Sequence, residues 1–583
     1  NPSRVPIELL ALPKDVQEFM KWSWSQVEPY YHELSVRELT AANLEEWLAD
    51  WSQLTEMVSE TQRRHYVATS VNTADAEAER RYKDFLDNIF PKAQAAEQKL
   101  KEKLLASGLK PPHGFEIQLR DMQTEAEIFR EANLPLLTEE EKLRKEYDKV
   151  IGAQTVTWEG AEVTIQQLYP VFQNPDRPTR ERAWRLASQR QLADRGKLND
   201  LWQQFLKLRL QLARNAGFGD YRSFRWKQLL RFDYTPEDCK RFHEAIEQVV
   251  VPAATRIYER GREQLQLKSL RPWDLTMPQG FGKIVDPPGT KPLKPFSQEV
   301  ELKAKCASIF QQVDSQLGSY FNTMMNQQLL DLMNRKSKAP GGYCTSFPVI
   351  KRPFIFMNGV GLHRDVQTLI HESGHAFHVF ETSHLPYYQQ RSASSEFAEV
   401  ASMGMELLAA PYLAAGRGGF YSETEAARAL REHLEQSIMF WPYMAVVDAF
   451  QQWVYENHEA ALEPATSDAQ WLQFWERFMT GVDWSGLEQE CMTRWQRQLH
   501  IFHEPFYYVE YGLAQLGAVQ VWRNALNNQR EAVEKYRRAL ALGGTKPLPE
   551  LYAAAGAKLA FDTDTLKIAV ELMERRIDEL YDF

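Results

Sequence analysis

The stretch DVQTLIHESGHAFHVFE, Asp365 to Glu381, has apolar residues at three- and four-residue intervals, which predicts an amphipathic helix. Asp365 is a candidate N-cap, and Pro386 marks the far limit of the helix. His371 and His375 are four residues apart, so a helix presents both imidazoles on one face. Glu372 points beside that face. The H-E-x-x-H spacing is typical of two zinc ligands with a general base next to the water that the metal binds.

A catalytic zinc site needs a third protein ligand and one open position. In one known pattern this ligand is a His ten residues after the first, but that position here is Glu381. In another pattern a Glu comes from a second helix some 20–30 residues downstream. The segment SSEFAEVASMGMELLAA, Ser394 to Ala410, is predicted to be such a helix, and Ser392 to Ser395 offers an N-cap. Two of its carboxylates, Glu396 and Glu399, are candidate ligands.

The rest of the chain predicts a large, mainly α protein with a small β-sheet. Gln154 to Ile165 alternates β-branched and polar residues, which indicates a β-hairpin, and PFIFMN, Pro353 to Asn358, is a candidate strand. A chain of 583 residues exceeds one compact core, so we expect at least two subdomains. We place them at 1–190, an N-terminal helical subdomain, and 191–583, a catalytic subdomain.

Composition excludes several classes of protein. With 44% hydrophobic and 25% charged residues the chain is expected to be globular, and a net charge of −10 argues against a nucleic-acid partner. No apolar run reaches the ~18–20 residues that span a bilayer. The opening segment 1–17 lacks the features of a secretory leader. The four cysteines, Cys239, Cys306, Cys344 and Cys491, form no pairable cluster, so we expect a cytoplasmic protein.

Three segments resemble the thimet oligopeptidase and oligoendopeptidase F family of zinc peptidases, and in particular its bacterial Pz-peptidase-like members. They are KAPGGYCTSFPVIKRPFIFMN (338–358), the 365–381 helix and EFAEVASMGMELL (396–408). The resemblance is dense from about residue 339 to residue 511. It implies a helical zincin in which two helical subdomains enclose a deep substrate channel.

The resemblance also chooses between the two candidate glutamates. In the family the third ligand is a Glu followed by Ser at +3 and Glu at +7, and Glu399, Ser402 and Glu406 fit this spacing. Glu406 is then expected to accept a hydrogen bond from a ligand histidine, and Glu396 becomes a supporting carboxylate. The resemblance implies one zinc ion per chain and Glu372 as the base that activates water. The implied zinc ligands are His371, His375 and Glu399.

A His- and Tyr-rich segment follows in the family, and here it is RQLHIFHEPFYYVEYGLAQLG, residues 497–517. Its side chains are candidate donors to the scissile carbonyl as that carbonyl becomes an oxyanion. The alignment leaves the histidine offset by one residue, so both histidines stay open; Tyr507 is expected to contact substrate. The candidate catalytic residues in this segment are His500, His503, Tyr508 and Tyr511.

We expect a bound peptide to lie along the strand that contains Phe354 and Phe356, as an addition to a sheet edge. Gly341 and Gly342, with Tyr343, would let the peptide backbone approach. The sequence therefore predicts a zinc-dependent endopeptidase that hydrolyses internal bonds of short unfolded oligopeptides. Two alternatives are a helical zinc carboxypeptidase, for which no cation is singled out, and a non-catalytic peptide-binding relative, against which the intact Glu372 argues.

Overall fold

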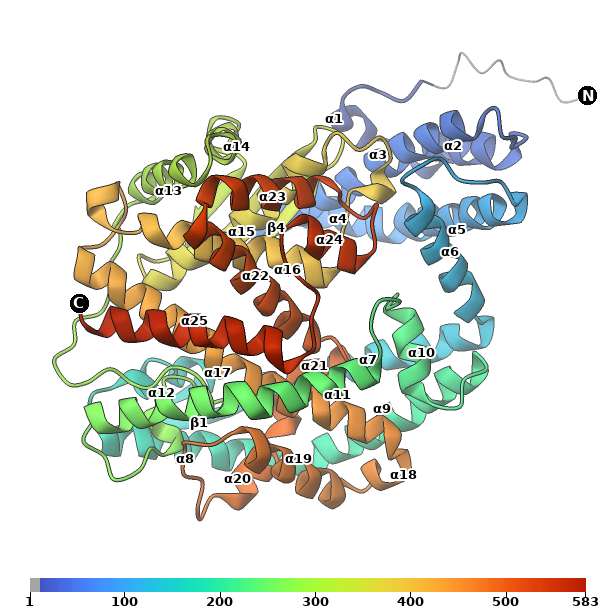
Figure 1. Ribbon diagram of the computed structural model, residues 1–583. Coiled ribbons are helices and arrows are strands. Elements are labelled where there is room, and N and C mark those ends of the chain that lie inside the picture. Colours follow the sequence, from blue (N-terminus) through green and yellow to red (C-terminus); the bar gives the residue numbers. More distant parts are fainter. Residues whose placement is uncertain (1–10) are drawn as a thin grey trace, which may run out of the picture. The chain divides into compact units, whose positions relative to one another are not determined.

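The computed structural model describes residues 11–583 and is mainly helical, as the sequence predicts (Figure 1). Residues 1–10, on which the expectation about a leader partly depends, lie outside this part. The chain divides into two compact units. The first unit comprises Asn1–Ala126, Leu293–Glu423 and Gly517–Lys558, and the second comprises Glu127–Pro292, Thr424–Leu516 and Leu559–Phe583. The predicted boundary near residue 190 falls inside α8 (Arg177–Ala193). The division into subdomains 1–190 and 191–583 stays a prediction.

The first unit packs an N-terminal group of helices around a core that contains Trp47, Trp51 and Phe85. The helix α4 ends at Asn88 and α5 begins at Phe90, and Pro91 lies in the first turn of α5, where a proline is tolerated. The helices of this unit are α1 (Val16–Phe19), α2 (Trp24–Val36), α3 (Leu44–Val71), α4 (Ala76–Asn88), α5 (Phe90–Ser107), α13 (Glu299–Val313), α14 (Ser315–Asn326), α15 (His363–Thr382), α16 (Ser395–Ala409), α23 (Gln529–Ala541) and α24 (Leu548–Ala554).

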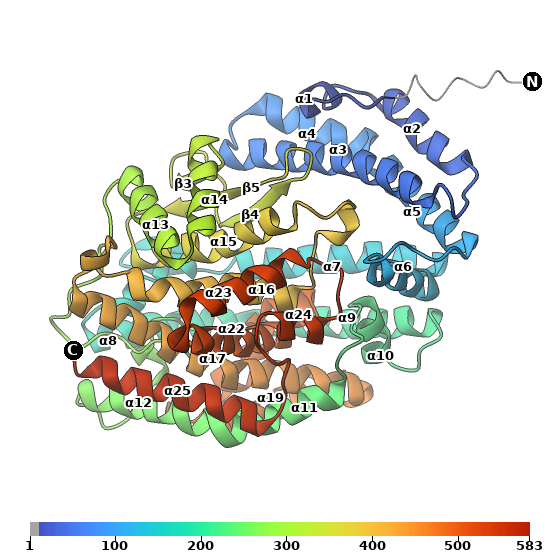
Figure 2. The same ribbon diagram turned by 45° about the horizontal axis from the view of Figure 1, so that its top comes forward.

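A three-stranded sheet lies beside α15 in this unit (Figure 2). Its strand order is β3 (Leu330–Met333), β5 (Arg352–Gly359), β4 (Tyr343–Phe347); β5 pairs parallel with β3 and antiparallel with β4. The predicted strand at 353–358 is therefore present within β5, but the expectation that it is an edge strand is wrong. Both sides of β5 already carry partner strands, so its backbone cannot accept a peptide, whereas β4 has one unpaired side.

Close contact between α15 and α16 depends on a glycine. A Cβ atom on Gly374 would lie 2.5 Å from the carbonyl oxygen of Ala401 and 2.6 Å from the Cα of Ser402. Only a residue without a side chain lets the two backbones approach this far. The helix α15 starts two residues before the predicted N-cap, because the Asp365 carboxylate accepts hydrogen bonds from the N–H groups of Val360 and Leu362 at 2.8 Å. The N-cap position of α16 is Ser394, inside the predicted range 392–395, but its side chain makes no capping hydrogen bond.

The second unit contains the predicted hairpin, with β1 (Thr155–Trp158) paired antiparallel to β2 (Ala161–Thr164). The hairpin shares a small core with Trp184 and Trp273. The helices α11 (Pro236–Ala245) and α12 (Val251–Gln264), joined by a π-helical turn at Ile246–Val250, form a rod that runs beside α25 (Thr563–Tyr581) in both ribbon views (Figures 1 and 2). The remaining helices of the second unit include α7 (Leu134–Gly152), α8, α9 (Arg195–Asn215), α10 (Tyr221–Gln228), α18 (His458–Ala461), α19 (Pro464–Phe478), α20 (Glu488–Met492) and α21 (Leu499–His503).

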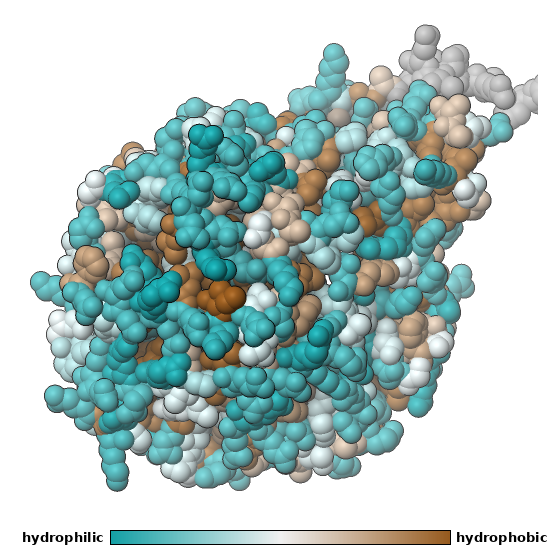
Figure 3. Space-filling view, in the orientation of Figure 1, coloured by the Kyte–Doolittle hydropathy of each residue, from teal (hydrophilic) through white to brown (hydrophobic). Residues whose placement is uncertain are grey.

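The chain passes several times from one unit to the other, and three of these crossings lie within a helix: α6 (Glu116–Ile128), α17 (Glu423–Glu456) and α22 (Val509–Asn527). Hydrophilic side chains predominate on the face drawn in Figure 3, and hydrophobic residues form scattered groups there. Within residues 11–583 we find no helix with the length and apolar character that crossing a membrane requires. All four cysteines are free thiols; Cys344 is half-buried and the others are buried.

Candidate metal centre

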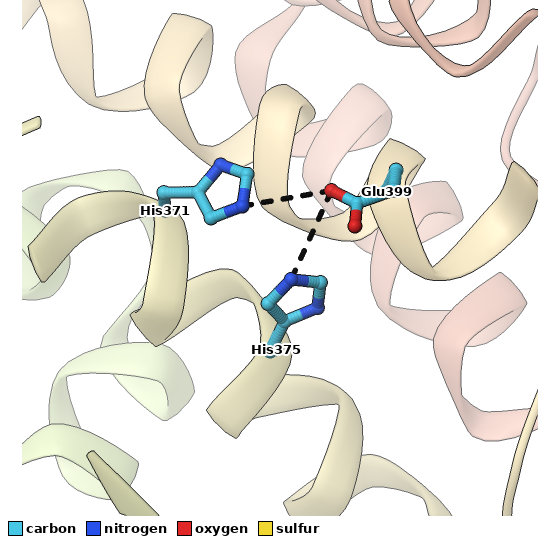
Figure 4. Close-up of side chains that lie close together, drawn as sticks. All are labelled: His371, His375 and Glu399. Carbon is cyan, nitrogen blue, oxygen red and sulfur yellow. Dashed lines mark ion pairs between the residues drawn. The ribbon is translucent and has the colours of Figure 1, made fainter. Parts of the chain in front are cut away.

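The candidate metal ligands meet between α15 and α16, inside the first unit (Figure 4). The Nε2 atom of His371 lies 3.5 Å from Oε2 of Glu399, and Nε2 of His375 lies 3.9 Å from the same oxygen. Tetrahedral nitrogen and oxygen ligands about 2.0–2.2 Å from a zinc ion lie roughly 3.3–3.6 Å apart. The three side chains therefore form a donor set of the type and size that zinc takes, and one coordination position is left for a water or substrate.

Hydrogen bonds orient two of these three side chains. The Nδ1 atom of His371 lies 2.6 Å from Oε1 of Glu406, a distance at which an N–H donates to the carboxylate, so Nε2 is the nitrogen that is left to bind a proton or a metal ion. The hydroxyl of Ser402 donates to Oε2 of Glu399 at 2.9 Å. This hydroxyl contacts the same oxygen that faces both histidines. The sequence alone predicted no hydrogen bond for Ser402 and no role for Gly374. The glycine inside H-E-S-G-H could have indicated that a second helix packs closely here.

The centre favours a positive charge. Burial lowers the pKa of His371, but the hydrogen bond to Glu406 and the charges of Glu406, Glu399 and Glu372 outweigh it and raise that pKa to about 9. Burial and the neighbouring His371 and His378 lower the pKa of His375 to about 3, so its Nε2 keeps a lone pair at neutral pH. A cation at this point, a proton or a metal ion, is stabilised by the surrounding carboxylates.

Glu372 lies beside the donor set rather than in it. Burial raises its pKa, the charges of Glu399 and Glu406 add to this, and His371 and the backbone N–H of Cys344 act in the opposite direction, so the pKa remains raised overall. A raised pKa makes the carboxylate a stronger proton acceptor. Burial and the charge of Glu372 raise the pKa of the Cys344 thiol, so it is protonated rather than nucleophilic.

Other predicted residues surround this centre at different depths. Glu396 is buried one turn before Glu399 and is not part of the metal-binding group. Gly341 has a φ of +94°, a conformation that glycine adopts without strain, and a Cβ on Gly342 would make only ordinary contacts. The Tyr343 ring stacks on Phe356 at 4.8 Å. Phe354 and Phe356 are buried in the central strand, so their side chains belong to the core.

The predicted oxyanion donors lie in the second unit, around the junction of α21 and α22. The ring of His500 lies 5.0 Å from that of Tyr508 and 6.0 Å from those of Tyr507 and Tyr511. Tyr508 and Tyr511 are 5.8 Å apart, centroid to centroid. These four residues form one aromatic cluster, which we call the tyrosine cluster.

The other candidate histidine lies elsewhere in the second unit. The Nε2 atom of His503 is 3.0 Å from a carboxylate oxygen of Asp148, and its ring packs against Tyr147 of α7 at 5.5 Å. His500 is therefore the histidine that accompanies the tyrosines. Burial lowers the pKa of His500 and raises that of Tyr508 well above its usual value, so the first is neutral and the second protonated at neutral pH.

The chain matches known proteins over most of its length. The model of Peptidase family M3 matches residues 171–570, and the Peptidase M3 N-terminal domain matches residues 18–113. Oligopeptidase PepF of Bacillus subtilis is 23% identical over 278 residues, which cover 45% of this chain and 39% of that protein. An oligoendopeptidase F homolog of Borreliella burgdorferi is 22% identical over 267 residues, which cover 44% of this chain and 43% of that protein.

These alignments span about two fifths of each curated relative. A solved structure of Pz peptidase A with an inhibitor is similar over 98% of this chain and 99% of its own, with 27% identity and a TM-score of 0.79. The family match covers more than half of the chain and includes every side chain of the candidate metal centre and of the tyrosine cluster. The chain therefore belongs to Peptidase family M3, as an oligoendopeptidase F-like member.

Proposed function

We propose that this peptidase is a zinc-dependent endopeptidase that hydrolyses internal bonds of short unfolded oligopeptides. The observation that carries the proposal is the convergence of two imidazole nitrogens and one carboxylate oxygen on one point, with the carboxylate of Glu372 beside it. This is the donor set of a catalytic rather than a structural zinc site, because it leaves a position open. The oligopeptidase relatives support peptides as the class of substrate.

The residues of this chain prepare the site before any substrate binds. Glu406 holds His371 in the tautomer whose Nε2 faces the centre, and Ser402 holds the Glu399 carboxylate toward the same point. Because both partners lie on α16, the packing at Gly374 fixes their distance from α15. His371, His375 and Glu399 would hold the zinc ion, which would supply Lewis-acid polarisation of the scissile carbonyl and a lower pKa for the attacking water.

Glu372 performs the proton transfers. Its carboxylate accepts a proton from the attacking water and then gives that proton to the amine that leaves. Buried carboxylates with raised pKa values are suited to both steps, since they hold a proton longer than an exposed carboxylate does. We propose that hydroxyl groups of Tyr508 and Tyr511, and the imidazole of His500, donate hydrogen bonds to the oxyanion. The burial that keeps Tyr508 protonated supports a donor role.

The unpaired side of β4 is where we propose that substrate backbone binds. This strand carries Cys344, whose N–H acts on Glu372, so a peptide added along β4 passes beside the base. An extended peptide exposes each of its bonds in turn, whereas a folded domain does not. A deep channel, preference for short peptides, one zinc ion per chain, a cytoplasmic location and the absence of a nucleic-acid partner stay predictions.

One assay tests the proposed function. Internally quenched peptides of roughly 5–20 residues are incubated with the enzyme, with and without 1,10-phenanthroline, and the products are read by mass spectrometry. We expect internal cleavage that the chelator abolishes and added zinc partly restores. Stepwise loss of single C-terminal residues would instead indicate a carboxypeptidase. Binding without cleavage by a zinc-loaded protein would indicate a non-catalytic relative.

A further inference from the structure

A pocket of about 350 Å³ adjoins the metal centre inside the first unit. It is lined by His375 and His378 of α15, by residues 344–346 of β4 and by Arg63 and Arg391. A second pocket of about 90 Å³ shares Arg63, Ser346 and Arg391 with it and adds Lys351. We call the two together the Arg63 pocket. A substrate held at the metal can extend into it, because one of the proposed zinc ligands forms part of its wall.

The described lining of the Arg63 pocket is cationic. It includes Arg63, Arg391 and Lys351, and neither half is lined by an Asp or Glu. Arg391 forms an ion pair with Glu56 at 2.6 Å. Arg63 has no carboxylate partner among residues 11–583. Its hydrogen bonds go to the carbonyl and hydroxyl oxygens of Ser346 and, at 3.0 Å, to the hydroxyl of Tyr388, which are neutral acceptors. The guanidinium charge is thus held in place but not neutralised.

The histidine in this wall adds no partner for a ligand. His378 is 7% exposed, and its Nε2 is enclosed by protein atoms and has no hydrogen-bond partner in the described part of the chain. Recognition of a ligand in the Arg63 pocket therefore depends on the two arginines and on Lys351.

We infer that the Arg63 pocket binds a carboxylate group of the substrate, about two residues from the bond that is cleaved. The inference rests on the proposed function and adds a specificity determinant to it. Ser346, which Arg63 contacts, lies two residues beyond Cys344 on β4, and an extended peptide advances ~3.3 Å per residue. The carboxylate comes either from an Asp or Glu side chain or from the C-terminus of the peptide.

Two peptide sets distinguish these sources. In the first, a neutral peptide carries Glu or Gln at each of the three positions on either side of the cleaved bond. In the second, the peptide ends as a free acid or as an amide one, two or three residues after that bond. We expect kcat/KM to be roughly 10- to 100-fold higher for the carboxylate member at one position. In Arg63→Met this ratio should fall close to one, and Arg63→Lys should restore part of it.

Arg80→Met is the matched control, because it removes an exposed arginine of the same unit that lines neither part of the pocket; its ratio should equal that of the wild type. If Arg63→Met does not fold, Lys351→Met at an exposed turn should lower the same ratio to a smaller extent. Equal kcat/KM for every carboxylate and neutral pair, or a ratio that survives in Arg63→Met, would overturn the inference.

Binding measurements separate this inference from the proposed function. Calorimetry with zinc-loaded Glu372→Gln enzyme compares the Kd of each carboxylate peptide with that of its neutral partner, and no turnover is needed. A tighter Kd that depends on Arg63 supports the pocket even if the wild type cleaves nothing, in which case the proposed function fails alone. Cleavage of neutral and acidic peptides at equal rates, with equal Kd values, leaves the proposed function intact and rejects the pocket.

Discussion

The metal centre and the tyrosine cluster differ in how the chain builds them. All the side chains of the metal centre lie on two helices, α15 and α16, in one unit, and hydrogen bonds within that unit orient two of the three, His371 and Glu399. The tyrosine cluster belongs to the other unit, where its rings contact one another and Phe440, and Nδ1 of His500 lies 2.8 Å from the amide nitrogen of Gln498. A polar centre with fixed partners is the signature of a preorganised binding site. A group of hydroxyl-bearing rings supplies candidate donors to the charge that develops on a substrate oxygen.

The largest expected effect breaks the metal centre. Glu399→Ala removes the only carboxylate of the donor set, so we expect loss of zinc and of all measurable peptidase activity. Metal content by mass spectrometry and cleavage of a quenched peptide check this. Glu396→Ala is the matched control one turn earlier on α16 and should keep its zinc. A full zinc complement in Glu399→Ala together with its loss in Glu396→Ala would reverse the assignment of the third ligand.

The next effect separates chemistry from metal binding within the same centre. Glu372→Gln should retain zinc and the fold but lower kcat by ~10²–10⁴-fold, because the amide cannot accept the proton of the water. Zinc stoichiometry and thermal denaturation, measured beside kcat, show whether the loss is confined to proton transfer. Near-normal turnover in a zinc-loaded Glu372→Gln enzyme contradicts the proposed mechanism.

The tyrosine cluster is tested by removing single hydroxyl groups. If Tyr511 donates to the oxyanion only in the transition state, Tyr511→Phe should lower kcat about 10²–10³-fold and change KM little. Tyr508→Phe, measured in parallel, shows which hydroxyl has the larger role. Tyr169→Phe is the control, since that ring packs near the hairpin in the same unit. An increase in KM with unchanged kcat would reassign Tyr511 to binding of the ground state.

The same comparison explains what the sequence could and could not predict. The helical spacing of His371 and His375 is local, so it was visible without a structure. The choice of Glu399 over Glu396 needed a family resemblance, because which face of α16 meets α15 is a tertiary property. The central position of β5 depends on its parallel pairing with β3. These two strands are separated in the sequence by β4, and no local sequence pattern encodes their pairing. Its hydrophobic run fits a strand with two neighbours as well as it fits an edge strand.

Two further features of the molecule depend on long-range packing and could not be predicted from local sequence. His500 and His503 are three residues apart on the short helix α21, yet one contacts the tyrosines and the other contacts Asp148. Their spacing alone could not tell which is which. Arg63 contacts Ser346, 283 positions later in the chain, and nothing in its own surroundings in the sequence marks it. Groups that depend on long-range packing were thus missed or left open, and groups that depend on helical periodicity were predicted.

The smallest effect concerns how the metal centre is held. Glu406 accepts the Nδ1–H of His371, and its charge raises the affinity of Nε2 for a cation. Glu406→Gln keeps an oxygen in the same place but removes the charge. We therefore expect zinc affinity to fall about 10- to 100-fold, measured by competition with a chelator, while kcat of the fully loaded enzyme changes much less.

Glu381→Gln is the matched control for this last prediction. It is the same substitution in the same unit, at a carboxylate that pairs with Arg537 at 2.7 Å and takes no part in the donor set. Its zinc affinity should equal that of the wild type. If Glu406→Gln also binds zinc as tightly as the wild type does, the short contact between Glu406 and His371 serves packing alone. If its affinity falls and added zinc restores activity, the carboxylate acts through the ligand that it orients.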